Sequence, residues 1–245
     1  MRRLLLALAL LLGPTQVQAE TALIAVAANF AKPSERLIQA FAAGTDHDIQ
    51  VSTGSTGALA AQIRNGAPFM AFLAADEERP KQLEAEGSAV AGTRFTYAVG
   101  RLVLWGPDPR WIALDPATSL ANPELKHLAI ANPKVAPYGR AAEETLTALG
   151  LWDAIQPKLV RGEDVAQTYQ FVASGNAELG FVGLSQVIDR SGSRWEVPQD
   201  LYAPIRQQAV LLAPGKGNEA AKAFLDFLRS APAREIVRSM GYGVE

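Results

Sequence analysis

Cysteine is absent from this chain of 245 residues, and histidine occurs only twice. The lack of cysteine excludes disulfide bonds, thiolate metal sites and a lipid anchor attached to an N-terminal cysteine. The two histidines, His47 and His127, stand far apart in the sequence and lack the spacing of a metal-binding pair. Neither residue type therefore indicates a redox centre or a zinc site.

An excess of charge and long apolar runs are missing as well. The chain carries 23 Lys and Arg against 25 Asp and Glu, and this balance gives no reason to expect a nucleic-acid partner. One apolar run, Leu4 to Leu12, follows two arginines and is too short to span a bilayer. Val17-Gln18-Ala19 fits the small-x-small pattern of a cleavage site. We therefore predict a signal peptide over residues 1–19 and a mature chain that begins at Glu20.

Short apolar runs alternate with helical patterns along the mature chain. The pattern predicts strands at 23–27, 49–53, 69–73, 101–105, 128–131, 159–160, 179–182 and 209–212. It predicts helices at 58–64, 77–86, 139–149 and 165–173, one with Pro33 near its start, one capped by Asn218 and one that begins at Pro232. This alternation predicts an α/β fold with parallel sheets.

Four junctions between a predicted strand and a predicted helix have a similar composition. Each ends its strand in small or polar residues: LIAVAANFAKPSERL, QVSTGSTGALAAQI, LAIANPKVAPYGRAAEETL and KLVRGEDVAQTYQFV. The start of a helix presents unpaired backbone N–H groups and the positive end of the helix dipole, so it attracts anions. Four such junctions in an exported chain predict a protein that captures a small anion.

Catalytic motifs are not found at these junctions. The turn at residues 54–57, Gly-Ser-Thr-Gly, is not the G-x-S-x-G of a nucleophile elbow, and it lacks the lysine of a P-loop. Asp164 and Arg140 lie near two of the junctions, where we expect them to serve helix ends. An enzyme would need a nucleophile with a base in reach, and none is evident.

The stretch PYGRAAEETLTALGLWDAIQPKLVRGEDVAQTYQFVASGNAELGFVGLSQV resembles the periplasmic molybdate-binding proteins of molybdate ABC transporters. The resemblance continues through AVAANF, GSTGALAAQI and AKAFLDFLRSAPAREIVRSMGYG and covers essentially the whole mature chain. It implies a type II periplasmic binding protein, in which two α/β lobes are joined by two crossovers and hold the ligand between them. Lobe I would comprise residues 20–101 and 207–245, and lobe II residues 102–206.

The resemblance also implies the binding residues, which offer neutral donors from both lobes. They are Asn29 through its amide, Thr56 through its hydroxyl, Tyr138 through its phenol or its backbone N–H, and Val165 through its backbone N–H. Ser55 would replace Thr56 if the register moved by one residue.

Two positions depart from patterns within the family. Gly183 stands where one branch has a tyrosine, and Ala28 stands where another has a hydroxyl donor. Each departure removes a hydroxyl and leaves the number of contacts to the ligand open.

The expected ligand is a tetrahedral dianion, molybdate or tungstate, which the cavity would select over sulfate by size. Phosphate is partly protonated and would need an acceptor such as a carboxylate. The expected protein is a periplasmic monomer that has no cofactor, catalyses no reaction and delivers its anion to an inner-membrane ABC permease. Without a lipid anchor, an outer membrane would have to retain it. The alternatives are a binding protein for sulfate, phosphate or another oxyanion, and a periplasmic enzyme on a similar scaffold.

Overall fold

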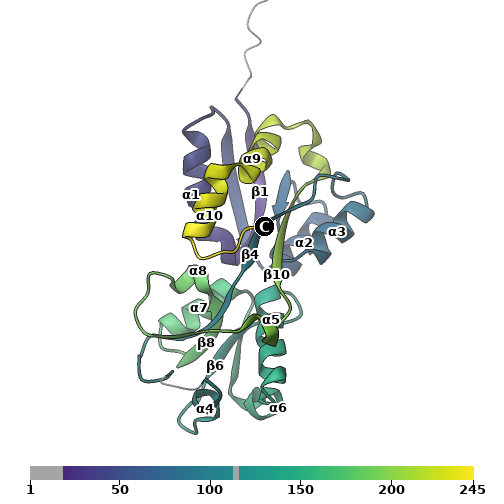
Figure 1. Cartoon of the computed structure of the whole chain (residues 1–245). Coiled ribbons are helices and arrows are strands. Elements are labelled where there is room, and N and C mark those ends of the chain that lie inside the picture. Colours follow the sequence, from purple (N-terminus) through teal and green to yellow (C-terminus); the bar gives the residue numbers. More distant parts are fainter. Residues whose placement is uncertain (1–18, 113–115) are drawn as a thin grey trace, which may run out of the picture.

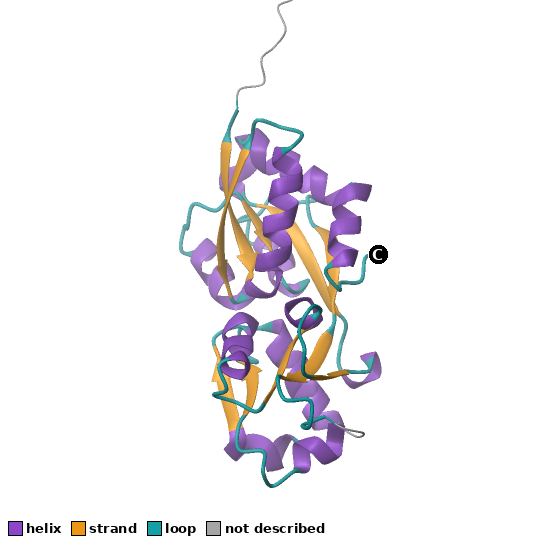
Figure 2. Cartoon of the chain, turned by 90° about the vertical axis from the view of Figure 1, so that its left-hand side faces the viewer, coloured by secondary structure: helices purple, strands orange, loops and turns teal. Residues whose placement is uncertain are grey.

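The computed structural model describes residues 19–112 and 116–245, so nearly all of the predicted signal peptide lies outside the described part. Two lobes stack end to end (Figure 1), and each is built on a five-stranded sheet. Helices flank both sheets, as the view in Figure 2 shows. None of the helices in the described ranges is long and apolar enough to cross a membrane.

The sheet of lobe I has the strand order β2-β1-β3-β10-β4. Its strands are β1 (Thr21–Ala27), β2 (Asp48–Gly54), β3 (Ala71–Leu73), β4 (Phe95–Gly100) and β10 (Ile205–Leu211). β1 runs parallel to β2 and β3, whereas β10 runs antiparallel to β3 and β4. This lobe also contains η1 (Ala28–Phe30), α1 (Ala31–Ala42), α2 (Thr56–Arg64), α3 (Glu78–Ala85), η4 (Ala213–Gly217), α9 (Glu219–Arg229) and α10 (Ala231–Ser239).

Apolar residues of β1 point to both faces of this sheet, and a hydrophobic core lies on each face. Ile24 packs in a cluster with apolar residues of α1, α9 and α10. Its neighbour Ala25 faces the other side, in a cluster with apolar residues of α2 and α3. Because successive side chains of a strand point to opposite faces, a strand covered by helices on both sides is apolar throughout.

The sheet of lobe II has the strand order β7-β6-β8-β5-β9. Its strands are β5 (Leu102–Gly106), β6 (Leu128–Ala131), β7 (Leu159–Gly162), β8 (Leu179–Gly183) and β9 (Ser193–Glu196). β6 is parallel to β7 and β8, and β5 is antiparallel to β8 and β9. The remaining elements are α4 (Pro116–Ala121), α5 (Pro137–Ala148), α6 (Trp152–Ile155), η2 (Gln156–Lys158), α7 (Val165–Ala173), α8 (Leu184–Val187) and η3 (Gln199–Leu201).

The chain passes between the lobes at two neighbouring places. β4 ends at Gly100 and β5 of the other lobe begins at Leu102. The return strand β10 begins at Ile205, which pairs with Gly100. Because Ile205 is paired with Gly100, the two connections between the lobes lie next to each other.

The predicted α/β alternation is confirmed, but the prediction of parallel sheets was wrong. Both sheets are mixed, because β5 and β10 enter their sheets from the opposite lobe and run against the neighbouring strands. Two strands, β4 and β9, were also missed. β4 ends only one residue before β5 begins, and β9 is a short edge strand with the largely polar sequence SRWE.

Candidate functional site

The four predicted binding residues line one cavity between the lobes, although they come from four separate junctions. The cavity is narrow, with a volume of about 10 Å³. Lobe I contributes the ends of β1 and β2 with the starts of η1 and α2, and lobe II contributes the starts of α5 and α7. The residues that line it are Ala27, Ala28, Asn29, Gly54, Ser55, Thr56, Ala75, Ala136, Pro137, Tyr138, Asp164 and Val165.

At the start of α2, the backbone donors are used up with one exception. Ser55 is the N-cap, and its hydroxyl accepts from the Ala58 N–H at 3.3 Å. The Gly57 N–H donates to the carbonyl oxygen of Val135, in the other lobe, at 2.8 Å. The Thr56 N–H has no acceptor among the residues that the structure describes. Because a buried N–H needs a partner, this group is available to a ligand.

The starts of α5 and α7 leave donors in the same way. Pro137 at the first position of α5 has no N–H, and Gly139 and Arg140 donate to the Ala136 carbonyl. The Tyr138 N–H is therefore left without an acceptor within the described chain. At α7, the N-cap Asp164 accepts from the Gln167 N–H at 2.9 Å through its side chain.

The first N–H of α7, that of Val165, likewise has no protein acceptor in the described ranges. Val165 itself is buried and packs in the apolar core of lobe II. Its contribution to the cavity is therefore its backbone.

The hydroxyl of Thr56 is set up to donate into the cavity. The side chain is buried, and its oxygen accepts from the Ala75 N–H at 3.1 Å. A hydroxyl has one hydrogen to donate besides its acceptor lone pairs, and this hydrogen is still available. The bond from Ala75 thus holds the oxygen in place without consuming its donor.

The side chain of Asn29 is occupied elsewhere. Its amide nitrogen donates to Gln207 Oε1 at 2.9 Å and to the hydroxyl of Tyr242 at 3.1 Å. Both amide hydrogens are therefore used inside the protein. The backbone N–H of Asn29, near the start of η1, has no acceptor in the described part of the chain. The geometry thus favours the backbone of Asn29, and not its amide, as the donor to a ligand.

The phenol of Tyr138 contacts a side chain of lobe I. Its hydroxyl accepts from Gln207 Nε2 at 3.3 Å, and its ring lies between the backbone of Gly100 and that of Gly183. A Cβ atom on Gly183 would stand 3.2 Å from a ring carbon of Tyr138. The tyrosine at 138 therefore takes up the room that a larger residue at 183 would need, and this explains the glycine there.

Behind the cavity, these side chains form what we call the buried polar network: Asn29, Tyr97, Tyr138, Ser185, Gln207 and Tyr242. Gln207 Oε1 accepts from the Tyr97 hydroxyl at 3.1 Å as well as from Asn29. The Tyr242 hydroxyl donates to the Asn29 carbonyl at 2.7 Å and pairs with Ser185 at 2.9 Å. Sequence reasoning missed Gln207, Tyr242, Tyr97 and Ser185, because no motif connects residues so distant along the chain.

Burial keeps this network uncharged. It raises the pKa of Tyr97 and of Tyr138 well above the usual range, and it raises the pKa of Tyr242 to about 12. Water is excluded from these hydroxyls, so the phenolate form is disfavoured. All three therefore remain neutral hydrogen-bond donors and acceptors at physiological pH.

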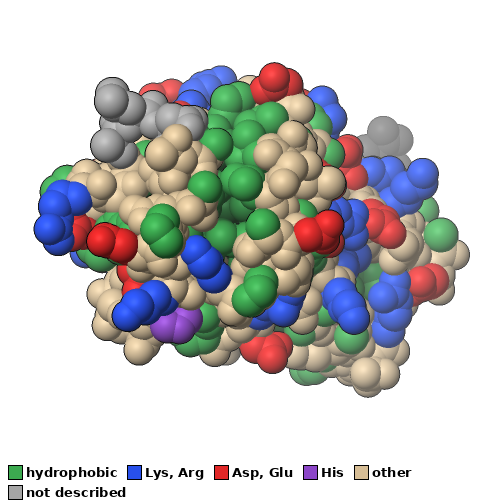
Figure 3. Space-filling view, turned by 90° about the horizontal axis from the view of Figure 1, so that it is seen from below, with side chains coloured by type: hydrophobic (Ala, Val, Ile, Leu, Met, Phe, Trp, Pro, Cys, Tyr) green, Lys and Arg blue, Asp and Glu red, His purple; other side chains and the backbone are tan. Residues whose placement is uncertain are grey.

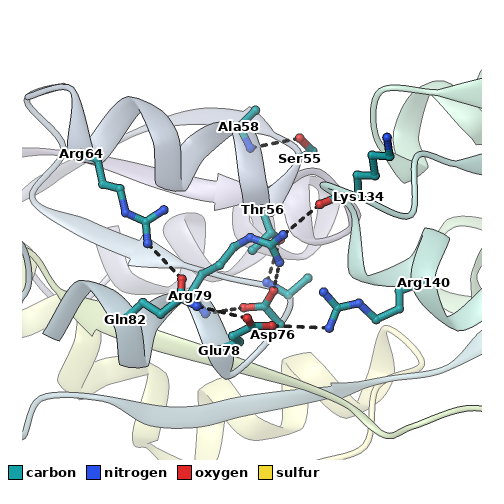
Figure 4. Close-up of polar contacts among 11 residues, drawn as sticks. Ser55, Thr56, Ala58, Arg64, Asp76, Glu78, Arg79, Gln82, Lys134 and Arg140 are labelled. Carbon is teal, nitrogen blue, oxygen red and sulfur yellow. Dashed lines mark hydrogen bonds and ion pairs between the residues drawn. The ribbon is translucent and has the colours of Figure 1, made fainter. Parts of the chain in front are cut away.

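Charged groups stay at the flanks of the cleft (Figure 4). Arg79 pairs with Asp76 and donates to the Lys134 carbonyl of lobe II at 3.3 Å. Arg140 of lobe II pairs with Glu78 of lobe I at 3.5 Å. Asp164 is the one acidic or basic residue that lines the described cavity, and it is engaged as a helix cap, as the sequence analysis expects.

A cavity lined by unpaired backbone donors between two lobes is typical of a solute-binding protein. The chain matches the family described as bacterial extracellular solute-binding protein over residues 22–243. It is 50% identical to the molybdate-binding protein ModA of Azotobacter vinelandii, over 99% of this chain and 98% of that protein. It is 48% identical to ModA of Rhodobacter capsulatus, over 98% and 95% of the respective chains.

A solved structure from the same group of proteins has the same fold. The fold matches the periplasmic molybdate-binding protein of Azotobacter vinelandii with a TM-score of 0.88 and 39% identity, over 91% of this chain and 99% of that one. The chain therefore belongs to the bacterial extracellular solute-binding proteins, in the group of the ModA proteins.

Proposed function

We propose that this protein captures molybdate, and also tungstate, in the periplasm and delivers the anion to an inner-membrane ABC permease without catalysing a reaction. The observation that supports this most is the set of unpaired donors, drawn from both lobes and aimed at one cavity. The names of its close relatives as molybdate-binding proteins indicate the anion.

The proposed ligand contacts are neutral throughout. They are the hydroxyl and N–H of Thr56 and the backbone N–H groups of Asn29, Tyr138 and Val165. Hydrogen bonds to a charged acceptor contribute roughly 1.5–3 kcal/mol each. Several together offset the loss of the anion's hydration, and fixed backbone donors set the distance between opposite walls of the cavity.

The proposed contacts come from both lobes and therefore link ligand binding to closure. We propose that lobe I comprises residues 20–101 and 207–245 and lobe II residues 102–206. Thr56 and Asn29 then face Tyr138 and Val165 across the cleft. An anion that touches both lobes gains contacts in the closed state that the open state lacks, so it favours closure.

Export and a monomeric state complete the proposal. Residues 1–19 would be removed as a signal peptide, and the soluble mature chain would act alone. Positive and negative side chains are interspersed on the end face of lobe II (Figure 3). A surface of this kind lacks the basic stripe that nucleic acid would require.

Calorimetric titration of the ligand-stripped mature chain tests the function. We expect one site per chain for molybdate and for tungstate, and far weaker binding of sulfate, which is smaller. Phosphate should also bind weakly, because the one carboxylate at the cavity, Asp164, is engaged as a helix cap. Equal affinity for sulfate and molybdate would exclude selection by size and favour a general oxyanion carrier.

A matched pair of variants at Thr56 tests the site. Thr56→Val removes the hydroxyl at nearly constant volume and should weaken molybdate binding by roughly 1.5–3 kcal/mol. Thr56→Ser keeps the hydroxyl and should bind almost as the natural chain does. If Thr56→Val retained full affinity in folded protein, the hydroxyl would not be a ligand contact.

A further inference from the structure

Gly57 makes the most direct contact between the lobes beside the proposed site. Its N–H donates to the Val135 carbonyl at 2.8 Å, so a backbone hydrogen bond crosses the cleft. Gly57 follows Thr56 at the start of α2, and Val135 precedes the start of α5. The bond therefore joins the two helix starts that offer Thr56 and Tyr138 to the ligand.

The absence of a side chain at Gly57 is what permits this approach. A Cβ atom there would lie 3.0 Å from each of three Val135 atoms, namely Cα, Cβ and the carbonyl oxygen. Two of these atoms belong to the backbone and have no rotamer by which to move away. A methyl group at position 57 would thus hold the lobes a few tenths of an ångström apart.

The segment of lobe II that receives this bond is braced internally. The N–H groups of Val135 and Ala136 donate to the Asn132 carbonyl at 3.1 and 2.9 Å. The Asn132 side chain accepts from the Lys134 N–H at 3.1 Å. Because Tyr138 follows directly on this braced turn, the position of the Val135 carbonyl also fixes the position of the Tyr138 N–H.

We propose that the Gly57–Val135 bridge sets the width of the closed cavity and thereby its preference for the larger oxyanion. Gly57 is a positioning residue, since it does not line the cavity itself. The inference rests on the proposed capture of molybdate. In the closed state the bridge holds Thr56 and Tyr138 at the separation that molybdate spans, and sulfate is too small to reach both sets of donors.

The test replaces Gly57 by alanine in the full mature chain. Alanine is favoured over glycine in a helix, so the ligand-free variant should melt no lower than the natural chain. We expect molybdate affinity to fall about tenfold or more, as for one lost hydrogen bond to a charged group. Sulfate affinity should fall less, so the molybdate-to-sulfate ratio should drop.

Small-angle X-ray scattering supplies a second measurement of the same variant. The natural chain should contract on adding molybdate, whereas Gly57→Ala should contract less at saturating anion. Gly217→Ala is the matched control, because a Cβ atom at Gly217 meets nothing within 4 Å. It should bind and contract as the natural chain does.

The outcomes separate this inference from the proposed function. If the natural chain binds molybdate and Gly57→Ala binds and contracts equally well, the bridge does not set the cavity width. If the ligand-free variant melts lower than the natural chain, its weaker molybdate binding is explained by a destabilised lobe I, and the inference fails. If the natural chain itself does not bind molybdate, the proposed function fails and takes the inference with it.

Discussion

Behind the cavity, side chains of both lobes meet in a buried, uncharged network, whereas two ion pairs that join the lobes, Glu78–Arg140 and Lys32–Asp189, are exposed. Gln207 at the centre of the network has no exposed surface. The side chains of Glu78 and Arg140 are 55% and 50% exposed, and those of Lys32 and Asp189, which pair across the lobes at 3.7 Å, are 56% and 72% exposed.

A contact between the lobes contributes a different free energy in each of the two environments. An exposed ion pair contributes about 0–1 kcal/mol, because water and salt screen it. Leaving a buried donor without its acceptor costs about 1–3 kcal/mol. We therefore expect the buried polar network to hold the lobes together more strongly than the two exposed ion pairs do.

Alkaline pH should destabilise the fold by ionising the tyrosines of the buried polar network. The unfolded chain ionises its tyrosines near pH 10, whereas burial raises the pKa of Tyr242 to about 12 and those of Tyr97 and Tyr138 well upward. The folded pKa values are raised, so stability is fully present below pH 10 and falls as pH rises toward 12. Melting temperature measured against pH should fall steeply in this window.

Ultraviolet titration of the tyrosines provides the check on this alkaline transition. Ionisation of the buried tyrosines should coincide with loss of the fold. Ionisation of all five tyrosines near pH 10 in a chain that stays folded would contradict the burial argument.

Gln207→Leu should be the most damaging single substitution at the hinge. It removes the acceptor of Asn29 and of Tyr97 and the donor to Tyr138. We expect a loss of roughly 2–4 kcal/mol in the free energy of unfolding, measured by urea denaturation. The control is Gln62→Leu, at an exposed position of α2, which should change stability by less than about 0.5 kcal/mol. Equal effects of the two variants would show that the network is not a structural unit.

Tyr138→Phe separates the two roles of this residue. The phenol belongs to the buried polar network, so its removal should lower stability by about 1 kcal/mol. The backbone N–H is unchanged, so molybdate affinity should stay within about twofold of the natural value. A large loss of affinity at unchanged stability would place the hydroxyl on the ligand instead.

Glu78→Gln should have the smallest effect. It removes the ion pair with Arg140 across the cleft, which lies at 3.5 Å between exposed side chains. We expect at most about 1 kcal/mol in stability or affinity, and the difference should vanish at high salt. A loss as large as that of Gln207→Leu would overturn the contrast between the two sides of the cleft.

Local sequence patterns placed some helix starts to the residue, whereas α2 and α5 begin two residues before their predicted starts at 58 and 139. The helix at 165–173 agrees with α7, and Asn218 caps α9 as predicted. Ser55 and Asp164 are caps that satisfy donors of their own helices. These features depend on residues three or four positions apart, so a short segment carries all the information.

The direction of the strands needed the whole fold. Only Arg101 separates β4 from β5, yet the two strands belong to different sheets. β10 lies between β3 and β4, far from both along the chain. Sheet order and direction follow from which surfaces are buried together, and a local pattern does not contain that information.

Local patterns in the sequence were enough to predict four helix starts that offer backbone donors, and the family resemblance added the Thr56 hydroxyl. Which side chains are engaged within the protein depends on contacts that form only in the folded chain. The Asn29 amide donates to Gln207 and Tyr242, which lie 178 and 213 residues further on, and the Tyr138 hydroxyl accepts from Gln207. A backbone N–H at a helix start is left unpaired by helix geometry alone, whereas a side chain donates to whatever the folded chain brings within reach.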